Sequence, residues 1–255
     1  MNPDHPPGDP PPATVNLSAC PVCGANGLLP GAEKSGYRFN RCRRCGYLFV
    51  NPRPAQKHLD SLYTATGMAG EPVCDKAGSR LRRAFLKLPR FLPYAWREDV
   101  LDLGCGGGFV AQALSLVARS STGIDISENA IAYARKRFRR PRFFCMNFSD
   151  LLATGNQYGF IHSSEVIEHV SDVNLYMQVL QKLARKGGHV YLTTPDAGHP
   201  RVPMNINDWD VFQPPAHVQF FSRTSMSILF ARYGFDTLKF YKNRKPGLHV
   251  LARKS

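Results

Sequence analysis

The sequence predicts an α/β protein with a Rossmann-like, doubly wound parallel sheet and a small cysteine-rich module before it. Residues 100–108 read V-L-D-L-G-C-G-G-G, where a short apolar run suited to a buried parallel strand meets a glycine turn. Residues 110–119 then carry apolar side chains at helical spacing, and Asp125 ends the next apolar stretch. Two C-x-x-C-G knuckles stand near the N-terminus. The strand, turn and helix predict the first half of a nucleotide-binding unit.

The N-terminal region divides into an arm and a cysteine module. Residues 1–16 hold six prolines, two acids and neither a sustained apolar pattern nor a signal-peptide pattern, so we expect a disordered arm. Residues 17–52 predict a zinc ribbon, because duplicated knuckles can complete a closed tetrahedral site of four thiolates. A redox pair is the alternative, which the duplication disfavours. The predicted zinc ligands are Cys20, Cys23, Cys42 and Cys45.

Residues 53–95 are expected to form a helical linker or lid, and residues 96–255 the main domain. The glycine turn predicts the cofactor of that domain. A dinucleotide site has G-x-G-x-x-G at a helix N-terminus, whereas these glycines are Gly104, Gly106 and Gly108. Asp102 would repel a phosphate but can face an ammonium group, and S-adenosylmethionine (SAM) has an ammonium and no phosphate. Asp125 is placed to accept hydrogen bonds from ribose hydroxyls.

This pattern resembles the first motif, D-x-G-x-G-x-G, of the class I SAM-dependent methyltransferases. The ribbon followed by V-N-P-R-P at residues 50–54 looks like a group of bacterial methyltransferases with an N-terminal zinc ribbon. The resemblance implies a seven-stranded class I methyltransferase sheet with an antiparallel last strand, and SAM as the cofactor. The predicted SAM-binding residues are Asp102, Gly104, Cys105, Gly106, Gly108, Asp125, Ile126, Asn147, Phe148 and Ser164.

The third strand is expected at residues 143–146. Class I enzymes usually place an acid after this strand to meet the adenine amino group, and Asn147 stands at that position here. Its side-chain carbonyl can still accept a hydrogen bond. Phe148 is expected to pack on the adenine, and Asp150 either meets the adenine or caps the next turn.

The fourth strand, at residues 158–164, leads into a segment that resembles the family's S-E-V-x-E-H-V. Glu165, Glu168 and His169 have i, i+3 and i+4 spacing, which would put them on one face of a helix turn. Such a set can bind a divalent cation or serve acid–base chemistry. Ubiquinone-pathway O-methyltransferases have a similar E-x-x-E-H and use a divalent cation there, although relatives without a metal carry the same letters. Alternatively, Glu165 caps the helix and His169 braces the strand ends.

A helix is expected over residues 175–183, ended by glycine at 187–188, and a fifth strand over residues 189–195. The proline-rich and aromatic segment 195–218 leaves that strand at the catalytic end of the sheet, so we expect a substrate-recognition loop. A disordered insertion is the alternative. His199 and His217 are possible general bases from this loop. A helix through Tyr233 and a terminal hairpin over residues 237–252 complete the prediction.

Composition limits the partners. The formal net charge is +14, which keeps RNA open as a substrate. However, the basic cluster at residues 135–142 is expected to end a helix at the sheet edge opposite the ligand crevice. No apolar run approaches the ~18 residues that span a membrane. We therefore expect no membrane span and, with cysteines in metal-type pairs, a cytoplasmic protein.

These observations predict a SAM-dependent methyltransferase that acts on a small molecule or on a sugar- or lipid-linked precursor, with oxygen as the expected acceptor atom. His169, Glu165 and His217 are the expected catalytic residues. No N/D-P-P-Y follows the fourth strand, which disfavours amino methylation of bases. The alternatives are an RNA methyltransferase, supported by the charge and the ribbon, and a SAM-binding scaffold that transfers no methyl group.

Overall fold

The central sheet of the computed structural model confirms the predicted fold class. The structure describes residues 14–65 and 76–255. Seven strands take the order β12-β13-β10-β9-β6-β7-β8, and β13 runs antiparallel to both of its neighbours. In chain order the strands are β6 (Asp99–Leu103), β7 (Ser120–Asp125), β8 (Arg142–Cys145), β9 (Tyr158–Ser164), β10 (Ala184–Pro195), β12 (Phe235–Phe240) and β13 (Gly247–Lys254).

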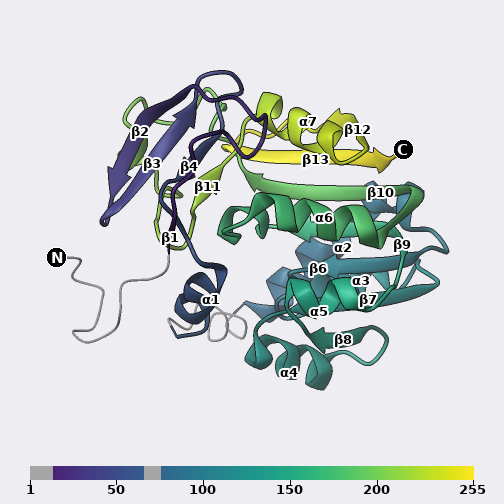
Figure 1. Ribbon diagram of the computed structural model, residues 1–255. Helices are drawn as coiled ribbons and strands as arrows, with labels where there is room; N and C mark the ends of the chain where they lie inside the picture. The colour runs from purple at the N-terminus through teal and green to yellow at the C-terminus, as the bar shows by residue number, and fades with distance from the viewer. Residues whose placement is uncertain (1–13, 66–75) are drawn as a thin grey trace.

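Helices cover both faces of this sheet (Figure 1). They are α2 (Ala77–Ala95), α3 (Phe109–Leu114), α4 (Glu128–Arg137), α5 (Phe148–Ala153), α6 (Val173–Leu183) and α7 (Arg223–Arg232). Side chains alternate along the strands, so that Phe160 packs with α2 while Ile161 packs with the α6 side. Because α2 is buried through Phe91 and Ala95, it is a layer of the main domain and not a detached linker.

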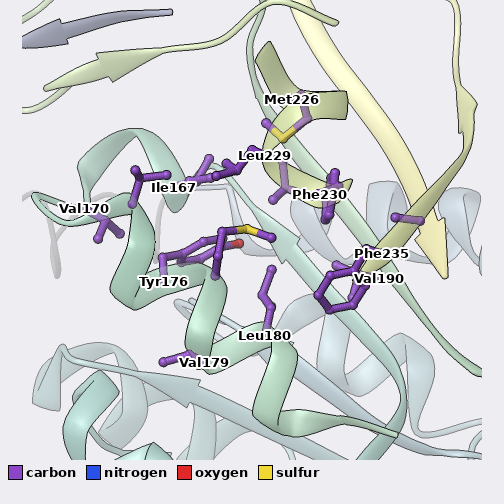
Figure 2. Packing of buried hydrophobic residues seen from close by; sticks show 14 of the residues in the cluster. Ile167, Val170, Tyr176, Val179, Leu180, Val190, Met226, Leu229, Phe230 and Phe235 are labelled. Atoms are coloured by element: carbon purple, nitrogen blue, oxygen red, sulfur yellow. The ribbon is translucent and has the colours of Figure 1, made fainter. Parts of the chain in front are cut away.

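The largest core cluster joins α6, β10 and α7 (Figure 2). Tyr176 and Leu180 of α6 point toward Val190 of β10 and toward Met226 and the neighbouring side chains of α7, and all are fully buried. Tyr176 also donates its hydroxyl hydrogen to Ser163 Oγ at 2.9 Å, which satisfies its one buried polar group. This core fixes the end of β9, from which the candidate site is built.

The cysteine module is a sheet of four strands with the order β11-β4-β3-β2. Three strands, β2 (Leu28–Lys34), β3 (Tyr37–Cys42) and β4 (Leu48–Val50), come from the predicted ribbon. The fourth, β11 (Gln219–Phe220), comes from far along the chain and pairs with β4. Figure 1 shows the module beyond the carboxyl end of β10. The ribbon therefore completes its sheet with a segment of the main domain.

The 195–218 segment is largely irregular, as expected of a loop, but it is not a disordered insertion. Trp209, Phe212 and Val218 are buried against Phe39 and Leu48 of the ribbon sheet. Burial of this apolar surface holds the segment, apart from the short turn η3 (Ile206–Asp208), in an irregular but packed path.

One expectation about the N-terminal arm is corrected; residues 1–13 of the arm lie outside the described part of the chain. Strand β1 (Thr14–Val15), which we expected within the disordered arm, pairs with β5 (Arg53–Pro54) and so satisfies its backbone groups.

Element ends also differ from the expectations. Helix α3 stops at Leu114, short of residue 119, and α6 ends at Leu183, where the chain enters β10 directly. The glycines at 187–188 thus lie inside a strand with an irregular register and not at a helix end. Helix α1 (Gln56–Ala65) follows the ribbon. No helix within residues 14–65 and 76–255 combines the length and apolar character that a membrane span requires.

Candidate functional site

A glycine turn at the carboxyl end of β6 forms the first wall of the site. Gly104, Gly106 and Gly108 all have positive φ, between 49° and 78°. A Cβ on Gly104 would lie 2.2 Å from Val166 Cγ2, and one on Gly108 would lie 2.6 Å from the Phe143 ring. Glycine is therefore required at both positions, for conformation and for space. Gly104 lines the cleft described below, whereas Cys105 and Gly108 are buried and do not line it.

A cleft of about 880 Å³ opens along the carboxyl ends of β6, β7, β8 and β9, where doubly wound sheets bind ligands. The half in which we expect the cofactor, named here the cofactor half, is lined by Leu103, Gly104, Ile124, Asp125, Ile126, Met146, Asn147, Phe148 and Ser149. Its other half is lined by Gln56, Lys57, Leu59 and Asp60 of α1, by Glu165, Val166, His169, Val170 and Leu175, and by Gln213, Pro214, Pro215 and Ala216. The volume is at the upper end of the ~300–1,000 Å³ typical of small-ligand sites.

Asp125 lies at the base of the cofactor half. Its Oδ2 accepts the Gly106 N–H at 2.8 Å and its Oδ1 accepts the Ser127 N–H at 3.0 Å. Burial raises the pKa of this carboxyl above its ordinary value, and backbone hydrogen bonds from Ser127, Gly106 and Ile126 oppose that rise. Each carboxylate oxygen keeps a further lone pair, which suits a pair of ribose hydroxyls.

Asp102 does not face the cleft as expected. Its Oδ1 pairs with His162 Nδ1 at 2.7 Å, and its Oδ2 accepts the Ala111 N–H of α3 at 3.0 Å. Both residues are buried, and the imidazole stacks parallel to the Tyr191 ring with centroids 5.9 Å apart. Asp102 therefore holds the glycine turn to α3 and β9. Sequence reasoning missed His162, because nothing local in β9 marks a partner 60 residues away.

The adenine end also differs from the expectation. Asn147 lines the cleft, but its Oδ1 accepts the Asp150 N–H at 3.0 Å, and Asp150 Oδ2 accepts the Asn147 N–H. The two form a capping box for α5, which decides the open question about Asp150 in favour of the cap. Phe148 lines the cleft and packs edge-on against Tyr176, with ring centroids 5.9 Å apart. Ser164 instead bonds Thr193 Oγ1 at 2.6 Å, outside the lining.

The acidic segment after β9 does not form one helical face. Glu165 has φ of 56°, and the short 3₁₀ turn η2 (Ile167–His169) begins only two residues later. Glu165 lines the cleft and accepts a hydrogen bond from Thr193 Oγ1 at 2.8 Å. Glu168 is buried and accepts one from Thr194 Oγ1 at 2.9 Å. The expectation that three side chains share a helix face is wrong, because the left-handed Glu165 breaks the spacing.

Glu168, His169 and His217 meet instead, with donor atoms within 4.8 Å of one another. The rings of the two histidines are perpendicular, with centroids 4.7 Å apart. His169 lines the cleft, whereas His217 is not one of its lining residues. Glu168 Oε1 is buried and finds no hydrogen-bond partner among the described residues. Burial and the Glu165 carboxylate raise the pKa of Glu168 well above its ordinary value.

Backbone carbonyls select the tautomers of these histidines. His169 Nδ1 lies 2.6 Å from Ala216 O, and His217 Nδ1 lies 2.6 Å from Val211 O. Because a carbonyl only accepts, each Nδ1 carries a hydrogen, so Nε2 is the basic nitrogen of the neutral ring. Burial, aided by the neighbouring His217, lowers the pKa of His169 to about 4. His199 lies elsewhere, with Nε2 3.3 Å from Asn243 O.

The four ribbon cysteines gather in one cluster. Cys20 and Cys45 have sulfurs 3.7 Å apart, and Cys23 and Cys42 have sulfurs 3.5 Å apart. Four sulfurs at the ~2.3 Å Zn–S distance of a tetrahedron stand about 3.8 Å apart, so these spacings fit a tetrahedral metal. Gly24 and Gly46 adopt positive φ and close each knuckle turn. The cluster is a closed set of four thiols with the chemistry of a structural metal site.

Comparisons with known proteins agree with this geometry. Residues 76–239 match the family described as "Methyltransferase domain". The protein named "Probable S-adenosylmethionine-dependent methyltransferase Rv3030" of Mycobacterium tuberculosis is 28% identical over 146 residues, which cover 57% of this chain and 53% of that protein. A ubiquinone biosynthesis O-methyltransferase of Rhizobium etli is 31% identical over 99 residues, or 37% of this chain and 40% of that enzyme. The chain thus spans about half the length of the relatives it matches, or less.

Solved structures share the fold. The magnesium protoporphyrin IX methyltransferase of Synechocystis PCC 6803, solved with bound S-adenosylhomocysteine, superposes with a TM-score of 0.58 at 15% identity. The superposition covers 79% of this chain and all of that enzyme. At this identity the likeness concerns the fold alone, and the ribbon and the 195–218 segment must be interpreted from their own contacts.

Proposed function

Since the chain belongs to the class I SAM-dependent methyltransferases, we propose that it methylates a hydroxyl group of a small, largely apolar acceptor. A sugar- or lipid-linked precursor is included in this class where its reacting end is compact. The ubiquinone O-methyltransferase of Rhizobium etli, at 31% identity over 99 residues, supports oxygen as the acceptor atom.

One observation carries the proposal: His169 is the imidazole at the acceptor half of an otherwise mainly apolar cleft. Leu59, Val170, Leu175 and the Pro214–Pro215 pair form the walls around it. Among the described lining residues, Lys57 is the only Lys or Arg. Small-molecule sites have this composition, whereas a nucleic-acid groove needs several cations for phosphates. The basic residues that raised the possibility of RNA lie outside the lining, which favours the small acceptor.

The chain's own residues fit SAM at the cofactor half. Gly104 lines the cleft and leaves no room for a Cβ beside Val166, so this part of the wall carries no side chain, and Asp125 keeps two lone pairs for ribose. Bound SAM supplies an electrophilic methyl group on a sulfonium. The walls would hold the acceptor hydroxyl beside the cofactor half and exclude water. His169 Nε2 would take the hydroxyl proton as the acceptor oxygen gains the methyl group, and the sulfur would keep the electron pair of the broken sulfur–carbon bond.

The proposal includes a structural metal in the ribbon and considers a second metal at the acceptor half. The four ribbon thiols fit a structural Zn²⁺, which would have no open position for chemistry. A divalent cation is the second candidate function of the acceptor end, now with Glu168, His169 and His217 as ligands in place of Glu165. The orphaned Glu168 Oε1 favours it. Activity that survives a chelator of Mg²⁺ and other accessible cations, with ribbon zinc retained, would support the base and not the cation.

The experiment is transfer of labelled methyl from SAM into a fractionated bacterial extract, with and without ribonuclease. We expect ribonuclease-resistant label in a small-molecule or lipid fraction. His169→Asn should reduce the rate about 10²- to 10⁴-fold while SAM affinity stays unchanged. His199→Asn is the matched control, since that imidazole lies outside the cleft. Label that ribonuclease removes would make RNA the substrate and overturn the proposal.

A further inference from the structure

One buried amide joins the cysteine module to the segment that carries His169. Gln219 is 2% exposed and lies on β11. The Tyr47 hydroxyl donates to Gln219 Oε1, so the amide oxygen faces the ribbon. Gln219 Nε2 donates to Ile167 O and to Val170 O, the second at 2.8 Å. The Gln219 side chain therefore accepts a hydrogen bond from the ribbon through its amide oxygen. Its amide nitrogen donates to both ends of the η2 turn.

The backbone repeats this connection. Val50 N donates to Val218 O at 2.8 Å, and Val218 N donates to Glu168 O at 2.9 Å. Two hydrogen bonds thus run from strand β4, through residue 218, to the turn between Ile167 and His169. Ala216, whose carbonyl fixes the His169 tautomer, lies in the same short stretch. Movement of β11 would disturb the position and the tautomer of His169 together.

The ribbon end of the connection depends on the cysteine cluster. Tyr47 follows Cys45 by two residues, and its carbonyl accepts the Cys42 N–H at 2.8 Å. Its ring is buried, stacks on Phe49 with centroids 5.0 Å apart, and belongs to the same core cluster as Cys20 and Cys45. Four thiols held by a metal would fix this hairpin, since a closed structural site supplies folding energy.

The cofactor half of the cleft has different supports. Asp125, the glycine turn and Asn147 are held by β6, β7, α3 and α5, through contacts within the main domain. Loss of order in the ribbon should therefore spare SAM binding and affect the acceptor half.

We propose that Gln219 is a positioning residue that transmits the metal-dependent order of the ribbon to His169. Metal release would then impair the acceptor half while the SAM half remains intact. This proposal depends on the proposed function only because that function identifies the half of the cleft around His169 as the acceptor half. Its test uses the position of the His169 ring and SAM binding, and needs no acceptor.

The test combines Gln219→Met with chelation of the full-length protein. Methionine has a similar length but leaves Tyr47 Oη and two carbonyls without their partner. We expect one zinc per chain and unchanged SAM affinity by calorimetry, a shifted His169 ring resonance by NMR, and about tenfold faster hydrogen exchange at Val218 N–H. Zinc removal from the wild type should shift the same resonance, and zinc removal from Gln219→Met should add little. Gln181→Met is the matched control, since that amide donates to Tyr233 O at the surface.

Additive shifts from chelation and substitution would overturn the proposal, as would an unmoved His169 resonance in zinc-free protein. If Gln219→Met fails to fold, Tyr47→Phe provides the test, because it removes only the hydrogen bond from the Tyr47 hydroxyl to the Gln219 amide oxygen. It should then shift His169 in the same direction by a smaller amount, and no shift would refute the link. A protein that transfers no methyl group, but whose His169 resonance shifts on zinc removal as described, would count against the proposed function and not against this connection.

Discussion

Replacement of Asp125 by alanine tests the cofactor half most directly. Of about four lone-pair sites on the carboxylate, the Gly106 and Ser127 N–H groups occupy two. The remaining two match the two hydroxyls of a ribose. A hydrogen bond to a charged group contributes about 1.5–3 kcal/mol net, so two such bonds contribute at least about 3 kcal/mol. At about 1.4 kcal/mol per tenfold, Asp125→Ala should weaken SAM binding by at least about 100-fold.

The assay is calorimetric titration with SAM and with S-adenosylhomocysteine, which share the ribose. Both affinities should fall by the same factor. Asp99→Ala is the control, because Asp99 begins β6 at the opposite edge of the sheet and contacts Arg119 and Ser120. Thermal unfolding of both variants checks that the folded fraction is unchanged. An unchanged affinity for SAM in a folded Asp125→Ala protein would refute the assignment.

The pH dependence of SAM binding offers a second check on the same carboxylate. Burial raises the pKa of Asp125, so the carboxyl takes up its proton at a higher pH than an ordinary aspartate. The ionised form accepts the hydroxyl hydrogens. SAM affinity should therefore decline as pH falls, and the decline should begin above the ordinary value of 3.8. Affinity that stays constant down to pH 3.8 would contradict the role of this group.

Three further predictions concern stability and metal content. Cys42→Ser should reduce bound zinc well below one per chain and lower the melting temperature, whereas Cys145→Ser, outside the cluster, should change neither by elemental analysis and calorimetry. Glu168→Gln should stabilise the protein increasingly as pH rises above 4.5. The raised pKa of Glu168 means that the folded state favours the protonated carboxyl, so the wild-type protein loses stability where this group must ionise. A pH-independent difference in thermal unfolding between variant and wild type would contradict this. Leu180→Ala, in the fully buried core of Figure 2, should cost about 2–5 kcal/mol in denaturant unfolding, and a loss under 1 kcal/mol would show that the core repacks.

Local patterns predicted the parts of the molecule that local physics decides. The apolar run at residues 100–103 predicted β6, because such a run directly before a glycine turn is typical of a buried strand that ends at a tight turn. Cysteine spacing predicted the thiol cluster, because two knuckles need only short turns. The terminal hairpin followed from apolar strands on either side of a polar turn. In each case the element is stabilised by residues that lie close in sequence, or it is marked by a strong local sequence pattern.

Tertiary partners decided the rest. Asp102 has the right position for an ammonium group, yet His162 and the amide of Ala111 occupy its oxygens. The i, i+3, i+4 spacing after β9 predicted one helical face, but the left-handed backbone places Glu165 outside the turn that holds Glu168 and His169. The Glu165 carboxylate still lies close enough to raise the pKa of Glu168. Pairing of β4 with β11 could not be inferred, since strands of three and two residues are too short to show a periodicity. Whether the remaining candidate residues bind or catalyse stays a prediction.

The pairing of β4 with β11 also bears on how the chain folds. Tyr47 and Gln219 are 172 residues apart, so the last strand of the ribbon sheet exists only after most of the chain has been synthesised. Until then β4 presents an open edge and Leu48 and Phe49 lack their cover. Contacts of such high sequence separation slow folding, because a long loop must close before they form. The ribbon should therefore be a late-maturing part of the protein, and residues 14–65 alone should make a poor transplantable module.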